Sequence, residues 1–197
     1  MGGFFSKLKD FLNREPEPPL PAPGTPIPSE VPRRFPHPPR PVAADGDPLL
    51  VPGWIEETVE RFSGEAETLA ADEEYGAAAA RYTQALEMVP EPRNEWEGTR
   101  WLLVGIGDAC FLAGGWEQAR NAFLDAMHCP DGIDDAFIHM RLGQIELELG
   151  DEEKAAQGLA HAYRKEGSEL FEDEDPKYLA FMKSRLPPPP GGWPAGW

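Results

Sequence analysis

The chain has 197 residues, of which 41% are apolar and 27% are charged, and its formal net charge is −17. This length leaves room for one globular domain with tails. Because 35 acidic side chains outnumber 18 basic ones, the surface as a whole would repel a polyphosphate, which argues against DNA or RNA as the main ligand.

Targeting signals and cysteine chemistry are sparse. No apolar run approaches the roughly 18 residues that cross a bilayer, and the first residues lack the apolar core and cleavage site of a signal peptide. We therefore expect a cytoplasmic protein. The two cysteines, Cys110 and Cys129, are too few for a disulfide framework and have no zinc-binding spacing. We expect both to be reduced, and we expect neither a metal nor a cofactor.

Residues 1–14, MGGFFSKLKDFLNR, form a candidate amphipathic helix. A helix this short is marginal alone and should fold only against something else. It could lie on a membrane surface, dock into a partner or fold back on the acidic domain, and the sequence leaves these alternatives open. The apolar face of this docking helix comprises Phe4, Phe5, Leu8, Phe11 and Leu12.

Residues 15–53 form a candidate linker. Positions 16–52 hold 14 prolines among 37 residues, and proline lacks a backbone donor and is excluded from helix interiors. This composition predicts an extended polyproline II or disordered tether rather than packed structure. The whole net charge lies beyond it, because positions 54–197 contain 12 basic and 29 acidic side chains, a difference of −17.

The segment 54–186 is expected to be helical almost throughout. Apolar and small residues recur at spacings of three and four, and no stretch alternates for long with a period of two. Asp134 or Asp135 and Asp175 are candidate N-caps, while Gly114 and Gly150 suit helix C-termini. The pattern predicts seven helices, near 54–71, 75–89, 96–113, 116–127, 135–149, 152–166 and 176–186.

The second helix of each successive pair repeats a pattern of small, large and small residues. The spacings of four and three suit a helix that approaches two neighbours closely while one bulky side chain fills the gap. A further small residue lies 12 positions before each copy. The superposed sets are Ala66, Gly107 and Gly143; Ala78, Ala119 and Ala155; Tyr82, Phe123 and Leu159; and Ala85, Ala126 and Ala162.

These columns resemble the tetratricopeptide repeat over residues 59–167 in three copies. The resemblance implies an all-α fold, a short right-handed α-solenoid of three helix pairs plus a C-terminal capping helix. The copies are offset by 41 and 36 residues rather than 34, so insertions must lengthen the turns or helices between them. Glu152 also stands where the third copy should have an aromatic residue. The alternative is an ordinary bundle whose alanines line its core.

The end of the chain combines a cap and a tail. In the segment PKYLAFMKSRL, Tyr178, Leu179 and Met182 share a face with Leu186, as expected of a helix that covers the last repeat. Residues 187–197 are rich in Pro, Gly and Trp and carry no charged side chain. We expect them to be a second low-complexity tail, either a docking peptide or a disordered end.

Catalytic patterns are absent. The adjacent His128 and Cys129 point about 100° apart in a helix and cannot form a dyad by themselves. The glycines at 105 and 107 lack the third glycine of a dinucleotide loop. The acidic run 172–175 lacks EF-hand spacing and is interpreted as a solvated helix cap. We therefore expect a protein that is not an enzyme.

Recognition of another protein remains. In the resembled family the partner lies in a concave groove lined by the first helix of each pair. Large aromatic residues beside carboxylates suit a partner that offers apolar anchors together with Lys or Arg. Alternatively, Trp101, Phe111 and Phe137 only pack beneath the inserted turns. The candidate groove residues are Glu60, Ser63, Glu67, Ala70, Trp101, Val104, Asp108, Phe111, Phe137, Met140, Gln144 and Leu147.

Two functional hypotheses follow. In their amino-acid sequence, the stretches FIHMRLGQIELELGDEEKAA and ELFEDEDPKYLAFMKSRL resemble bacterial repeat proteins, some of which are found beside polymorphic toxin genes and presumed to be immunity proteins. The first hypothesis is a non-enzymatic protein-binding module, an adaptor or an immunity protein that masks a basic toxin. The second is a membrane-peripheral scaffold anchored through residues 1–14.

Overall fold

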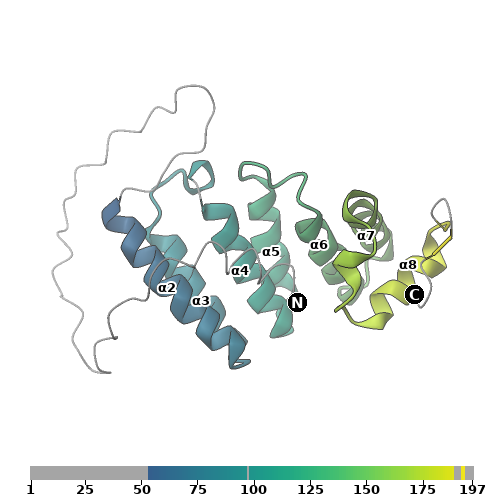
Figure 1. Cartoon of the computed structure of the whole chain (residues 1–197), viewed down its shortest axis with the longest axis horizontal. Coiled ribbons are helices and arrows are strands. Elements are labelled where there is room, and N and C mark those ends of the chain that lie inside the picture. Colours follow the sequence, from purple (N-terminus) through teal and green to yellow (C-terminus); the bar gives the residue numbers. More distant parts are fainter. Residues whose placement is uncertain (1–52, 97, 189–191, 194–197) are drawn as a thin grey trace. The chain divides into compact units, whose positions relative to one another are not determined.

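The computed structural model describes residues 53–96, 98–188 and 192–193, which all fall within the compact unit 43–197 (Figure 1). This part of the chain is all-α, as predicted, and contains seven α-helices, two short 3-10 helices and no strand. None of its helices has the length and apolar character needed to cross a membrane. The elements are α2 (Gly53–Ala71), α3 (Tyr75–Met88), η2 (Arg93–Glu95), α4 (Thr99–Leu112), α5 (Trp116–Met127), α6 (Ala136–Glu148), α7 (Glu152–Glu166), η3 (Glu169–Phe171) and α8 (Pro176–Arg185).

Some of the predicted features lie outside the described residues. These are the docking helix 1–14 with Phe4, Phe5, Leu8, Phe11 and Leu12, the proline-rich linker up to position 52, and Trp197 in the tail.

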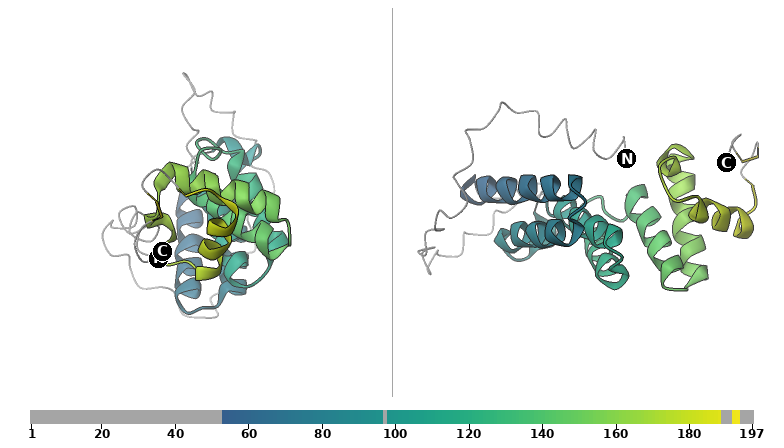
Figure 2. Two further views of the ribbon diagram at one scale, coloured as in Figure 1. Left: turned by 90° about the vertical axis from the view of Figure 1, so that its right-hand side faces the viewer. Right: turned by 90° about the horizontal axis from the view of Figure 1, so that it is seen from below.

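Each helix packs mainly against its neighbours in the chain. The most extensive contacts join α2 with α3, α4 with α5, and α6 with α7. These are the three helix pairs predicted from the sequence. Further contacts join α3 with α4 and α5 with α6, while α8 packs against α7 (Figure 2). The core is accordingly spread along the chain of helices.

The turn inside each helix pair is built in the same way. Glu73, Gly114 and Gly150 have φ angles of 62°, 77° and 87°, in the left-handed region that glycine adopts most readily. Each belongs to a Schellman motif, in which this residue and the next donate to carbonyls of the last helical turn. The predicted C-terminal roles of Gly114 and Gly150 are confirmed, and Glu73 performs the same role without being glycine.

Two predicted N-caps are confirmed. The Asp135 carboxylate accepts hydrogen bonds from the backbone N–H groups of Phe137 and Ile138 at 3.0 and 3.3 Å. At α8, the Asp175 carboxylate accepts from the N–H of Lys177 at 2.9 Å, and proline occupies the first turn. These side chains satisfy backbone donors that have no partner inside the helix.

The repeated small and large residues form the packing surfaces between helices. A Cβ added to Gly107 would lie 2.7 Å from the Phe123 ring, and one added to Gly143 would lie 2.7 Å from the backbone nitrogen of Leu159. The small residues therefore set how closely the paired helices approach. The column residues with no more than 6% exposure include Ala66, Ala78, Tyr82, Ala85, Ala119, Phe123, Ala126, Ala155, Leu159 and Ala162.

The contacts between successive pairs also recur. The rings of Tyr82 and Trp101 meet edge to face with centroids 6.1 Å apart, and those of Phe123 and Phe137 do so at 6.3 Å. Tyr82 and Phe123 belong to one repeated column, and Trp101 and Phe137 are separated by the second repeat offset of 36 residues. The α3–α4 and α5–α6 contacts are therefore built from equivalent residues.

Helix α4 begins three residues later than predicted. After Pro90, the chain forms the 3-10 helix η2, and Trp96 is 4% exposed. Gly98 then reverses the chain with a φ of 84°, and α4 starts at Thr99. Because the inserted segment contributes its own buried aromatic residue, it forms a distinct packed element instead of lengthening the helix.

The C-terminal cap is larger than the sequence indicated. Tyr178 and Met182 of α8 are buried, and Leu179 and Leu186 pack against the same cluster, in agreement with the predicted face. In addition, Trp193, which was assigned to a tail, meets the Tyr163 ring edge to face with a centroid separation of 5.5 Å. The described part of the tail therefore contributes to the core.

Candidate functional site

One polar column runs through the first helices of the three pairs. Glu67 of α2, Asp108 of α4 and Gln144 of α6 are separated by the repeat offsets of 41 and 36 residues. All three are candidate groove residues. Their surroundings differ, and this difference defines the candidate site.

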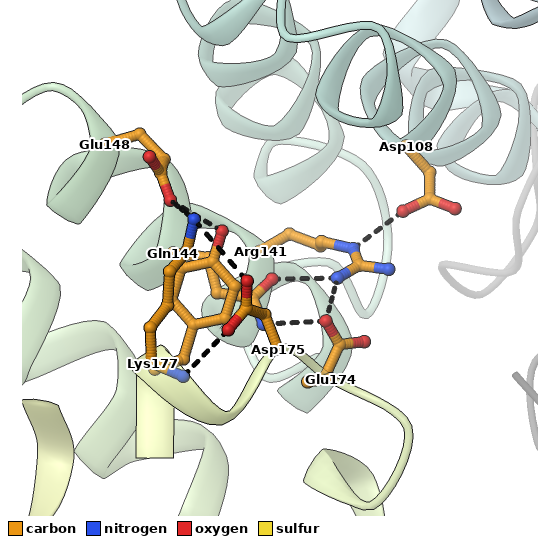
Figure 3. Close-up of polar contacts among 8 residues, drawn as sticks. Asp108, Arg141, Gln144, Glu148, Glu174, Asp175 and Lys177 are labelled. Atoms are coloured by element: carbon orange, nitrogen blue, oxygen red, sulfur yellow. Dashed lines mark hydrogen bonds and ion pairs between the residues drawn. The ribbon is translucent and has the colours of Figure 1, made fainter. Parts of the chain in front are cut away.

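Arg141 organises the second and third members of the column (Figure 3). Its Nε donates to Asp108 Oδ1 at 2.6 Å, and its terminal nitrogen donates to Gln144 Oε1 at 2.8 Å. The same nitrogen donates to Glu174 Oε2 at 2.6 Å, and Gln144 Nε2 reaches that oxygen at 2.9 Å. One guanidinium thus connects α4, α6 and the loop before α8.

Two aromatic rings complete the environment of Arg141. Its guanidinium carbon lies 4.6 Å from the centroid of Phe111 and 5.0 Å from that of Phe137, within the range of cation–π attraction. Burial alone would lower the pKa of Arg141, but the charges of Asp108 and Glu174 outweigh it and raise the pKa. The cation is therefore permanent and is paired with two carboxylates of the same chain.

A neighbouring set of contacts fixes the start of α8 on α6. The Tyr178 hydroxyl donates to Glu148 Oε1 at 2.8 Å. Lys177 Nζ lies 2.6 Å from the same oxygen (Figure 3). Burial, followed by the hydrogen bond that the hydroxyl donates to the Glu148 carboxylate, raises the pKa of Tyr178. The segment 174–178 therefore covers part of the face that the resemblance assigned to a partner.

Glu67 has no such partner. Its Oε1 atom is sheltered from solvent and accepts no hydrogen bond, and no described cation pairs with the carboxylate. Burial raises the pKa of Glu67 to about 7. The pKa of Tyr82 is raised by burial and then by the charges of Glu67 and Asp108, so both carboxylates act on this hydroxyl. As a whole residue, Glu67 is only partly buried.

The other candidate residues differ in accessibility. Glu60 is exposed, whereas Glu67, Trp101 and Phe137 are half-buried. Ala70 and Leu147 are half-buried too, and the remaining candidates lie inside the protein or in the Arg141 network. Phe111 packs against Trp116 of α5 and Tyr178 of α8, which lie outside the two inserted turns. The candidate residues with less than 9% exposure are Ser63, Val104, Phe111, Met140 and Gln144.

Sequence reasoning missed Arg141 and Glu174. The signal for Arg141 was a single charge in the apolar run FIHMRLGQI, at a position where a helix has little room for an unpaired cation. Glu174 belongs to the acidic run that was interpreted as a solvated cap. Asp175 does cap α8, but Glu174 points to Arg141 instead.

Cysteine and metal chemistry leave no second site among the described residues. Burial raises the pKa of both Cys110 and Cys129, so neither thiol is activated. His128 Nδ1 contacts the backbone oxygen of Leu124 at 2.7 Å. The described part of the chain contains no group of three or more His, Cys, Asp or Glu that could hold a metal ion.

Comparison with known proteins adds no identity. No family model matches the chain, and no curated protein matches it.

Proposed function

We propose that residues 54–186 form a non-enzymatic protein-binding module of three tetratricopeptide-like repeats, arranged as a right-handed α-solenoid with α8 as its cap. Its first-helix face receives a basic partner through Glu67. Three features support the repeats: the common turns at Glu73, Gly114 and Gly150, the buried small-residue columns, and the two equivalent ring pairs.

The observation that carries this proposal is the unpartnered Glu67 carboxylate. A sheltered carboxylate without a donor costs stability, whereas the equivalent Asp108 has the Arg141 guanidinium. A partner that brings Lys or Arg would supply the missing contact. The strongly negative charge of the domain would speed the approach of such a partner.

The accessible residues around Glu67 suggest what else the partner offers. Trp101 is half-buried beside Tyr82, and Glu60 is exposed on the same helix as Glu67. An apolar group next to a basic side chain would use both kinds of contact. An adaptor and a toxin-neutralising immunity protein would share this recognition, and they differ in the partner they hold.

The test compares partner capture by three immobilised forms of the intact chain. Glu67→Gln should weaken binding of the captured partner at least tenfold, because a neutral amide cannot pair with its cation. Glu87→Gln, an exposed carboxylate on α3, is the matched control and should bind as the wild type does. Raising NaCl from 50 to 300 mM should weaken the wild-type complex. Equal affinity of the two variants, or affinity independent of salt, would place the binding surface elsewhere.

A further inference from the structure

We propose that Glu67 and Trp101 form a recognition site for one arginine side chain of the partner. This inference deepens the proposed function and rests on it, because it names the chemical group that the Glu67 face takes. The chain already fills a site of the same construction with its own arginine.

The filled site lies one repeat further along. Arg141 donates to the Asp108 carboxylate at 2.6 Å and lies over the ring of Phe137 at 5.0 Å. Phe111 covers it from a second side at 4.6 Å. The site therefore consists of a carboxylate from one repeat, a ring from the next, and a guanidinium between them.

Moving back by one repeat gives the proposed site. Asp108 becomes Glu67, and Phe137 becomes Trp101. The contact of the ring is preserved as well as its sequence position, because Trp101 meets Tyr82 edge to face at 6.1 Å as Phe137 meets Phe123 at 6.3 Å. The Glu67 carboxylate stands at the position in its helix pair that Asp108 has in the next.

The guanidinium is the missing part. The position equivalent to Arg141 is Gly105, where a Cβ would lie 2.9 Å from the Tyr82 ring. No side chain can therefore fill the site from this backbone position without moving the ring. The position equivalent to Phe111 is Ala70, so the second ring is also absent. The site keeps its acceptor and one wall, and it lacks the groups that would close it.

The chemistry favours arginine over lysine. A guanidinium is planar, so it can stack on the Trp101 ring while its edge donates to the Glu67 carboxylate. It is also more weakly hydrated than an ammonium group, which lowers the cost of entering a partly sheltered position. Tryptophan is the best of the aromatic side chains for this contact.

The experiment titrates the intact chain with two probes, N-acetyl-argininamide and N-acetyl-lysinamide, at equal ionic strength. NMR follows the Trp101 indole N–H and the Glu67 side-chain carbon. We expect the arginine probe to shift both signals, to lower the pKa of Glu67, and to bind at least fivefold more tightly than the lysine probe. Glu67→Gln should weaken arginine binding at least tenfold, whereas the control Glu87→Gln should leave it unchanged.

The ring is tested by two substitutions. Trp101→Phe restores the residue type of the filled site and should retain at least a third of the arginine affinity, whereas Trp101→Leu should lose most of it. Circular dichroism verifies that both variants are folded, and the preference for arginine over lysine and the Glu67→Gln variant decide the outcome if the Leu variant is not. Equal binding of the two probes, or an effect of neither substitution, would overturn the arginine site. Continued partner capture that depends on Glu67 would leave the proposed function intact in that case.

Discussion

At the scale of single residues, Glu67 and Asp108 show how one position acquires two roles. Both are acidic, and they occupy equivalent positions in the first and second helix pairs. Asp108 is neutralised by Arg141 and holds the structure together, while Glu67 is sheltered without a cation. A carboxylate in this state destabilises the free protein. A bound partner that supplies a cation would offset this cost, and unfavourable local features of this kind are typical of functional sites.

This cost predicts a pH dependence. The pKa of Glu67 is about 7 in the folded protein against 4.5 in the unfolded chain, so between these values only the folded state retains the proton. Glu67 therefore makes the free energy of unfolding fall as pH rises from about 4.5 to about 7. Glu67→Gln removes this dependence. The difference in free energy of unfolding between the variant and the wild type should therefore shift in favour of the variant as the pH rises from 5 to 8.

Urea unfolding at the two pH values measures the effect. The control Glu87→Gln, on the exposed side of α3, should keep the wild-type difference between pH 5 and pH 8. If both variants change with pH in the same way, Glu67 is not the group responsible.

Residues with a local role were the most predictable. Asp135 and Asp175 cap helices through bonds to residues two or three positions away, and Gly114 and Gly150 reverse the chain within one turn. Such signals lie in a short stretch of sequence. Arg141 and Glu174 are 33 positions apart, and the reason for their pairing exists only after α6 and the loop before α8 have come together.

At the scale of helices, the paired packing depends on glycine at selected positions. Gly107 and Gly64 both lie inside α-helices, where glycine is intrinsically less favourable than alanine. A Cβ at Gly107 would lie 2.7 Å from the Phe123 ring, whereas a Cβ at Gly64 would have nothing within 4 Å. The same substitution should therefore have opposite effects at the two positions.

We expect Gly107→Ala to lower the free energy of unfolding by about 1 to 3 kcal/mol, because the Phe123 ring must move to admit the methyl group. Gly64→Ala should raise it by about 0.5 to 1 kcal/mol through helix propensity. Chemical denaturation of the intact chain measures both values. Two changes of the same sign would show that the close approach of α4 and α5 is not the limiting contact.

Helix boundaries were predictable where the columns of small and large residues are regular, and less so in the segments inserted between the helix pairs. Helix α5 and helix α7 have the predicted bounds, because their columns of small and large residues run without interruption. Helix α4 starts at Thr99 because Trp96 is buried and Gly98 has a positive φ angle. Whether an inserted segment extends a helix or packs separately depends on whether the folded protein offers space to bury its aromatic residue. The local sequence alone does not show that space.

At the scale of the whole domain, the core consists of distinct clusters. One contains Tyr82, Val89 and Trp96 from the first pair and the following insertion. Another contains Met140, Phe171 and Met182 from the last pair and its cap. In a stack of repeats, each unit depends chiefly on its neighbours, so damage at one end should remain there, whereas in a bundle with a single core it would spread.

This distinction gives a direct test of the proposed solenoid. Met182 is fully buried, and Met182→Ala should cost about 2 to 5 kcal/mol in the stability of its own cluster. Hydrogen exchange should then show faster opening of α6, α7 and α8, with the protection of α2 and α3 nearly unchanged. The reciprocal variant, Val89→Ala, should speed exchange in α2, α3 and α4 and spare α8. Uniform loss of protection in both variants would instead indicate one cooperative bundle, and a continuous binding face along the first helices would lose its structural basis.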